Sequence, residues 1–297
     1  MSRQSEFGAA LAQPGSSASA SLLRLDSEIV ASGLVPDLYE YSAKADTQLQ
    51  PWRATYYFDV GRHPAELAGA VDQLFLRAAS ALNIRLGAFP DFLGQAGWRS
   101  QLVQTVLGID AREDAGSLRL KYYWVLKPNS GALLGALLTA LGLERQAPRD
   151  LDKVYICGLD FTQRGLLDVK LYYVLEQRRV PAFIQNFAAV RELFAGTRLV
   201  VYQHCLRAPD KRQMFFHATR SAVIQRELLR QSRRSASALE LLQRVERMRL
   251  SLGAPSAVLG EDGDRGGHRL EPWILAFPYS NRVLDLNAFN VYFHVGE

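Results

Sequence analysis

The stretch GSLRLKYYWVLKP (residues 116–128) decides how this chain can fold. Every second residue from Leu118 to Leu126 is leucine, tyrosine or tryptophan, whereas the residues between them include Arg119, Lys121 and Tyr123. A two-residue alternation predicts a β-strand with one apolar face and one face of cations and tyrosine. The cationic face meets either water or a ligand.

A second copy of this pattern follows along the chain. GIDAREDAGSLRLKYYWVL (108–126) aligns with GLDFTQRGLLDVKLYYVL (158–175), and the second turn is one residue shorter. Both copies keep a Gly-x-Asp start and a Lys-x-Tyr pair on one strand face. Two extended runs joined by a polar, glycine-containing turn indicate a β-hairpin, so the hairpin is a repeated unit.

Three weaker copies complete the series. DLYEYSAKA with WRATYYFDV (37–60) forms the first hairpin, residues 199–218 the fourth, and residues 271–295 the fifth, with its turn near Ser280–Asn281. Helical patterns lie between the hairpins, at 20–32, 64–84, 131–143, 181–196 and about 219–252. The chain therefore reads helix, strand, strand, five times over.

Ten sequential strands without parallel crossovers predict an antiparallel sheet, and closing it into a barrel removes the exposed edges. Helices must then cover the outside, so the leucine and tryptophan face points outward and the cationic face inward. We expect an α+β fold: a ten-stranded antiparallel β-barrel with a polar, solvent-filled interior, surrounded by helices. We expect one domain over residues 20–297, preceded by a disordered segment at 1–19 rich in Ala, Ser, Gly and Gln.

The inward positions share polar or aromatic character. They are Glu40, Ser42, Lys44, Arg53, Thr55, Tyr57, Arg119, Lys121, Tyr123, Lys170, Tyr172, Tyr202, His204, Asn290 and Tyr292. Several cations in one enclosed space repel one another unless an anion neutralises them. A diphosphate or triphosphate fits this requirement. The alternative is a structural network in which Asp168, Asp285 and other acids pair with the cations.

Composition supports no other class of partner. The 35 Lys and Arg residues exceed the 30 Asp and Glu residues by five, too small a surplus to indicate nucleic acid. Cys157 and Cys205 lie in apolar runs and predict buried free thiols. No run of 18 apolar residues occurs, so we expect no membrane span. The N-terminus has no secretory pattern, and we expect a cytoplasmic monomer.

Motifs of other enzyme classes are missing from the sequence. No P-loop, dinucleotide-binding glycine motif, zincin spacing or nucleophile elbow occurs. GEDGDRGG (260–267) lacks the ligand pattern of a calcium loop and is interpreted as a flexible loop. The arginines of RQSRRS (230–235) are interpreted as a solvated helix face.

The ordered set of motifs resembles the ABBA-fold prenyltransferases, and within them the cyanobactin peptide prenyltransferases. The likeness runs from about residue 34 onward. It is carried by YEYSAK, WRATYYF, VLGIDAREDAGSLRLK, CGLDFTQRGLLDVKLYYV, LRAPDKRQMFFHA and LNAFNVYFHV. The resemblance implies transfer of a dimethylallyl or geranyl group from its diphosphate to a side chain of a ribosomal peptide, which can be macrocyclic or linear.

The resemblance also implies roles for individual residues. Glu40 becomes the catalytic base, with a simple ion pair to Lys44 or a neighbouring arginine as the alternative. The implied diphosphate ligands are Arg53, Arg119, Lys121, Lys170, Tyr172, Arg207 and Tyr292. The implied isoprenoid pocket is Tyr57, Tyr123, Tyr202, Phe216 and Trp273. Phe215 departs from the family, where tyrosine would supply a phosphate hydrogen bond. Mg²⁺ is implied as a cofactor held through the diphosphate, since an Asp-rich metal motif is missing.

Two alternatives stay open at this stage. An enzyme of the same fold could act on a small aromatic acceptor, which a capped barrel mouth would favour over a wide one. A non-catalytic barrel could bind an anionic ligand, in which case Glu40→Gln would leave affinity unchanged with no turnover to lose.

Overall fold

The computed structural model describes residues 17–46, 49–61, 64–110, 118–251 and 269–296. Ten strands of seven to twelve residues dominate this part of the chain. They are β1 (Leu38–Ala45), β2 (Leu49–Asp59), β3 (Leu102–Asp110), β4 (Arg119–Leu126), β5 (Val154–Thr162), β6 (Gly165–Leu175), β7 (Thr197–Cys205), β8 (Arg212–Ala218), β9 (Arg269–Ser280) and β11 (Phe289–Gly296). A two-residue strand, β10 (Val283–Leu284), pairs with the end of β9.

The ten strands close into a barrel. Each pairs antiparallel with its neighbours in the order β9-β11-β1-β2-β3-β4-β5-β6-β7-β8, and β8 pairs back onto β9, with Met214 opposite Phe277. Closure leaves no unpaired edge among the long strands described. The expected ten-stranded antiparallel barrel is confirmed.

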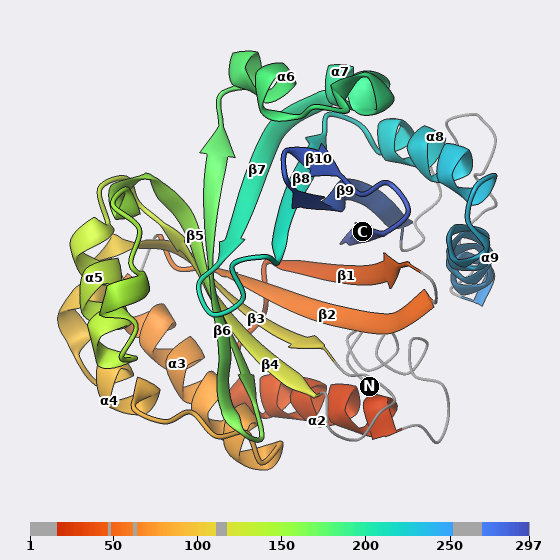
Figure 1. Ribbon diagram of the computed structural model, residues 1–297. Helices are drawn as coiled ribbons and strands as arrows, with labels where there is room; N and C mark the ends of the chain where they lie inside the picture. Colours follow the sequence, from red (N-terminus) through yellow and green to blue (C-terminus); the bar gives the residue numbers. More distant parts are fainter. Residues whose placement is uncertain (1–16, 47–48, 62–63, 111–117, 252–268, 297) are drawn as a thin grey trace.

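Helices lie around the outside of the strands (Figure 1). They are α2 (Ser17–Ser32), α3 (Pro64–Ala81), α4 (Phe89–Leu93), α5 (Gly131–Ala140), α6 (Val180–Phe183), α7 (Arg191–Ala195), α8 (Ser221–Ser232) and α9 (Ala236–Ser251). In α3, Ala68, Val71, Phe75 and Ala78 recur at three- or four-residue spacing and are buried. This spacing gives α3 the apolar stripe that faces the barrel wall.

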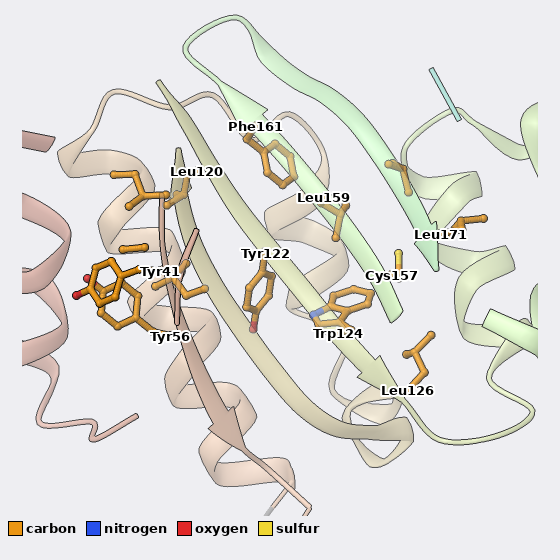
Figure 2. Packing of buried hydrophobic residues seen from close by; sticks show 14 of the residues in the cluster. Tyr41, Tyr56, Leu120, Tyr122, Trp124, Leu126, Cys157, Leu159, Phe161 and Leu171 are labelled. Atoms are coloured by element: carbon orange, nitrogen blue, oxygen red, sulfur yellow. The ribbon is translucent and has the colours of Figure 1, made fainter. Parts of the chain in front are cut away.

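The outward strand faces form the main core, between barrel and helices. Tyr122 and Trp124 are fully buried there, and the Tyr122 ring stacks on Phe75 of α3 at 4.7 Å between centroids. Figure 2 shows them with Leu120, Phe161 and Leu171 on the helix-facing side of the sheet. The apolar face of residues 118–126 therefore meets helices, as the alternation predicts.

The segment 181–196 differs from the expected single helix. It is broken into α6, one short 3-10 helix (Phe187–Val190) and α7. The backbone N–H of Gln185 donates to Arg282 O, and the Asn186 side chain both donates to Leu284 O and accepts from Leu284 N. These contacts bind the segment to the β9–β10 turn, where Asn281 and Arg282 have φ of 48° and 64°. The helix is interrupted here because the backbone N–H of Gln185 bonds to the β9–β10 turn and not to a carbonyl of the preceding helical turn.

Two other boundaries also differ from expectation. The Arg-rich run is split into α8 and α9, because Ser235 accepts a hydrogen bond from Ala238 N and begins a new helix. Helix α2 begins at Ser17, inside the stretch expected to be disordered. Residues 1–16 and the expected loop at 260–267 lie outside the described residues. None of the helices in the described part of the chain has the length and apolar character to span a bilayer.

Candidate functional site

The inward faces of the strands enclose a cavity of about 190 Å³. Eight of the thirteen side chains predicted for the site line it: Glu40, Arg53, Tyr57, Lys121, Tyr123, Tyr172, Trp273 and Tyr292. Ser42 and Thr55, also predicted to face inward, line it as well. The alternation in the sequence therefore assigns most of the barrel interior correctly.

Charge and aromatic character are separated along the inward faces of β2, β4 and β6. The cation lies nearer the β-hairpin turns, and a tyrosine lies further from them on the same strand face. Lys121 precedes Tyr123 on β4, Lys170 precedes Tyr172 on β6, and Arg53 precedes Tyr57 by four residues on β2. A ligand in the barrel meets positive charge toward the turns and aromatic rings beyond it.

Two buried aspartates hold the cations in place. The Asp110 carboxylate lies 3.5 Å from Arg53 Nε and 3.5 Å from Lys121 Nζ. Asp160 pairs with Lys170, with 2.5 Å between Nζ and Oδ2. The Arg53 guanidinium also donates to Asn290 Oδ1 at 3.3 Å. Three cations against two carboxylates leave a surplus of one positive charge in this cluster.

Burial makes the surplus charge costly. It lowers the pKa of Lys121 to about 8, although Asp110 and Asp160 oppose the shift. Burial alone would raise the pKa of Asp160, but the charges of Lys170 and Lys121 outweigh it and lower that pKa. Lys170 and Arg53 also repel the charge of Lys121. An anionic ligand beside Lys121 would relieve this repulsion.

Glu40 is 3% exposed and is the third residue of β1, opposite Thr55 and His294. Burial raises its pKa to about 8, and the donors Tyr57 and Trp273 and the charge of Lys121 lower it only in part. Trp273 therefore lies near the carboxyl without completing a well-formed hydrogen bond, and neither Oε2 of Glu40 nor Nε1 of Trp273 has such a bond to any described residue. Glu40 does not form the ion pair with Lys44 considered as its alternative; Lys44 pairs with Asp46 at 2.6 Å.

Aromatic rings form the wall beyond the cations. Tyr172 meets Tyr123 edge to face, with centroids 6.3 Å apart, and meets Phe215 at 5.6 Å. Phe215 in turn lies 5.8 Å from Tyr292. Burial raises the pKa of the Tyr292 hydroxyl, so it remains a hydrogen-bond donor. Phe215 thus belongs to the wall without a hydroxyl to offer a phosphate.

Trp273 enters the cavity because of a β-bulge. Tyr292 pairs with Ile274 and Phe293 with Pro272, so Trp273 is the extra residue on β9. Its ring lies 3.6 Å from that of His294 and 5.5 Å from that of His217. Burial lowers the pKa of both histidines to about 4, which leaves them neutral at physiological pH.

The predicted orientation of Tyr202 and His204 is wrong. Tyr202 pairs with Tyr173 and packs outside the barrel against Phe183 and Tyr279. Val201 and Gln203 occupy the inward positions of β7. The two alternating sets on β7 are equally mixed in polarity, so periodicity could not distinguish the faces.

Phe216 is also wrongly assigned to the isoprenoid pocket. It faces the helices, fully buried, with its ring 6.0 Å from Phe277. Neighbouring residues of a strand point to opposite faces, so only one of the two phenylalanines can line the cavity, and it is Phe215.

Three predicted diphosphate ligands lie away from the cavity lining, for different reasons. Arg207 is exposed in the β7–β8 turn, where its guanidinium donates to Leu166 O and its backbone N–H to Asp168 Oδ1. This position contradicts its predicted place in the barrel. Lys170 and Arg119 keep their inward register; Lys170 pairs with Asp160, and Arg119 lies opposite Asp110 at the strand end.

The acids that pair with the cations are not those named in advance. Asp168 accepts from the backbone of Val169 and Arg207, and Asp285 accepts from Asn287 N. The partners are Asp110 and Asp160, the repeated Asp of the two Gly-x-Asp starts. The repeat itself was the signal that could have found them.

The described residues do not fit a magnesium ion held by the protein. They contain no group of three or more His, Cys, Asp and Glu side chains suited to a metal ion. Asp110 and Asp160 already lie against cations. Cys157 and Cys205 are free and buried, as predicted, and burial raises the pKa of each to about 12.

Comparison with known proteins identifies the fold. No protein-family model matches the sequence, and no curated protein matches it. Solved structures do match. The crystal structure of 5-dimethylallyltryptophan synthase from Streptomyces coelicolor has a TM-score of 0.53 at 12% identity, covering 98% of this chain and 95% of that one.

Two further structures agree. AnaPT from Neosartorya fischeri has a TM-score of 0.52 at 14% identity, over 87% of this chain and 78% of that one. NotF in complex with brevianamide F and DMSPP has a TM-score of 0.52 at 12% identity, over 87% and 80%. At these identities the likeness establishes the fold, which is the ABBA barrel.

Proposed function

We propose that this protein transfers an isoprenyl group from an isoprenyl diphosphate to a small aromatic acceptor. The observation that carries the proposal is the arrangement inside the barrel: buried cations lie toward the turns, with tyrosines beyond them on the same strand faces. An allylic diphosphate has a charged diphosphate group that would match the cations and an apolar isoprenyl chain that would match the tyrosines.

The diphosphate would lie against Arg53, Lys121 and Lys170. Asp110 and Asp160 hold these cations in position before a ligand arrives. Negative charge grows on the diphosphate as the allylic C–O bond breaks and the electron pair leaves with oxygen. Fixed positive charges in a buried site stabilise that change without reorganising at the moment of reaction.

The carbocation left behind would lie among Tyr123, Tyr172 and Trp273. Aromatic faces stabilise a cation, and the closed barrel wall keeps water away from it. An electron pair of the acceptor ring then forms the new C–C bond. Glu40, in its ionised form, takes the proton that the ring loses.

A small acceptor suits the cavity better than a peptide. The cavity has a volume of about 190 Å³, which is below the ~300 Å³ at which pockets for drug-sized ligands begin. Two of the solved structures with this fold are a dimethylallyltryptophan synthase and a complex with brevianamide F and DMSPP. The peptide acceptor implied by the sequence resemblance has no support from these observations.

Magnesium stays a prediction about the substrate. Mg²⁺ would come with the diphosphate, because the described side chains offer it no ligand set. We expect EDTA to reduce turnover less than the loss of Lys121 does, as measured with the same donor and acceptor.

The experiment is incubation of the protein with dimethylallyl or geranyl diphosphate and three kinds of acceptor: free tryptophan, a tryptophan-containing cyclic dipeptide, and a panel of macrocyclic peptides. Mass spectrometry should find one isoprenyl group added to a small acceptor. Addition only to the macrocycles would instead support the peptide reading. Donor binding without any product would support a non-catalytic barrel.

A further inference from the structure

We propose that Gly158 is a positioning residue that seats the ring of Tyr123 against the barrel wall and thereby sets how large an isoprenoid chain the cavity accepts. The part of this proposal that concerns the isoprenoid rests on the proposed function. The part that concerns Gly158 and Tyr123 rests on the packing alone.

Gly158 lies on β5, directly opposite Tyr123 on β4 and Lys170 on β6. A Cβ at this position would lie 2.4 Å from Cδ1 and 2.5 Å from Cε1 of Tyr123. Non-bonded carbon atoms pack at about 3.5–4.0 Å, so the tyrosine ring occupies the space of the missing side chain. Any other residue at 158 requires the ring to move.

Because the Tyr123 ring lines the cavity on the side away from Gly158, we expect a Cβ at 158 to push the ring toward the cavity. Tyr123 lines the cavity on one side and covers Gly158 on the other, and Tyr172 lies beside it at 6.3 Å. The same Cβ would lie 3.5 Å from Tyr172 Cε2, an ordinary packing distance, so the clash at 158 is with the Tyr123 ring. A side chain at 158 therefore narrows a cavity that holds only about 190 Å³.

A second glycine supplies the matched control. Gly108 starts the other Gly-x-Asp copy and lies opposite Lys121, on the same inward face one strand away from Tyr123. A Cβ there would lie 3.5 Å from Ala54 O and from Lys121 Cβ, and 3.7 Å from Thr55 Oγ1. These are ordinary packing distances. The repeat thus contains two equivalent glycines, of which only one seats a ring.

The position of Tyr123 connects this packing to chain length. Tyr123 is two residues from Lys121, and Tyr172 is two residues from Lys170. A chain that starts at a diphosphate on these lysines must pass the two tyrosines. Displacement of one ring narrows that passage, so a ten-carbon geranyl chain would lose more affinity than a five-carbon dimethylallyl chain.

The experiment compares Gly158→Ala with Gly108→Ala in the full chain. Isothermal titration calorimetry would measure the dissociation constants of dimethylallyl and geranyl S-thiolodiphosphate, which are non-reactive donors. We expect Gly158→Ala to weaken geranyl binding roughly tenfold more than dimethylallyl binding, since one methylene group changes discrimination by about 10–200-fold in an apolar pocket. Gly108→Ala should leave the ratio of the two constants within about twofold.

A Tyr123→Ala background tests the cause. If the Cβ acts through the ring, adding Gly158→Ala to Tyr123→Ala changes neither the melting temperature nor the ratio of the geranyl to the dimethylallyl dissociation constant. Gly158→Ala alone lowers the melting temperature and raises that ratio. An equal loss for both donors, or an undiminished effect without the ring, would overturn the proposal. Failure of the wild-type chain to bind either donor would contradict the proposed function instead, and the melting temperatures would still decide whether Gly158 seats Tyr123.

Discussion

Glu40 and Lys121 line the same cavity, and burial brings the pKa of each to about 8, upward for the carboxyl and downward for the ammonium. The catalytic form needs the opposite of what burial favours at both groups: an ionised Glu40 and a charged Lys121. Both are present together only in a narrow range around this pH.

The first prediction is a bell-shaped dependence of kcat/KM on pH, with its maximum near 8, because kcat/KM follows the groups of the free enzyme. The rising limb follows deprotonation of Glu40, and the falling limb follows loss of the Lys121 proton. Because the groups interact, the two apparent pKa values belong to the pair. Glu40→Gln should abolish the rising limb and reduce kcat about 10²-fold or more while donor affinity is kept. A rising limb that survives in Glu40→Gln would assign it to another group.

Glu40 also makes the stability of the fold depend on pH. Its pKa is about 8 in the folded chain against 4.5 for an ordinary glutamate, so the folded state retains a proton that the unfolded state releases. This stabilisation is fully present below about 4.5 and is lost as pH rises through 8. Urea unfolding should show the free energy of unfolding falling over this window, and Glu40→Gln should flatten the slope. An unchanged slope would mean that Glu40 is ionised at neutral pH.

The sequence resemblance implies that Lys121 and Arg207 both bind the diphosphate, but only Lys121 lines the cavity. Lys121→Ala should weaken binding of dimethylallyl S-thiolodiphosphate at least tenfold, because it removes a buried charge beside the ligand. Arg207→Ala should change it by less than about twofold, because Arg207 lies exposed in the β7–β8 turn. Calorimetry checks both. A loss from Arg207→Ala with none from Lys121→Ala would place the diphosphate at the turn and not in the cavity.

Phe215 and Phe216 are neighbours on β8 with different surroundings. Phe216→Ala should cost about 3–5 kcal/mol of unfolding free energy, because it opens a hole in the core between barrel and helices. It should leave donor preference unchanged. Phe215→Ala enlarges the cavity and should shift preference toward geranyl diphosphate. Denaturation and competition between the two donors separate these effects, and a shift in preference from Phe216→Ala would contradict the assigned faces.

Most of the fold follows from the sequence because strand periodicity and repetition are local properties. The alternation at 118–126 fixes which face of β4 meets the helices, and its copy at 166–175 fixes β6. Closure of the barrel follows from the number of strands and the cost of open edges. The inward cations Arg53, Lys121 and Lys170 therefore lie where the pattern predicts.

The errors arise where local pattern carries no information. On β7, Tyr202 points outward and packs against Phe183 of α6, a tertiary contact that the residue pattern of β7 does not contain. Trp273 enters the cavity through a bulge set by its pairing with β11. The fit between Gly158 and Tyr123 depends on which strands become neighbours, so no property of either residue alone reveals it.

The central claim is that the barrel cavity holds an isoprenyl diphosphate with its charged end at the lysines. A crystal structure with dimethylallyl S-thiolodiphosphate tests this most directly. We predict the diphosphate against Arg53, Lys121 and Lys170, with the dimethylallyl group between Tyr123 and Tyr172. A diphosphate bound outside the barrel, for example at Arg207, with an empty cavity, would contradict the account.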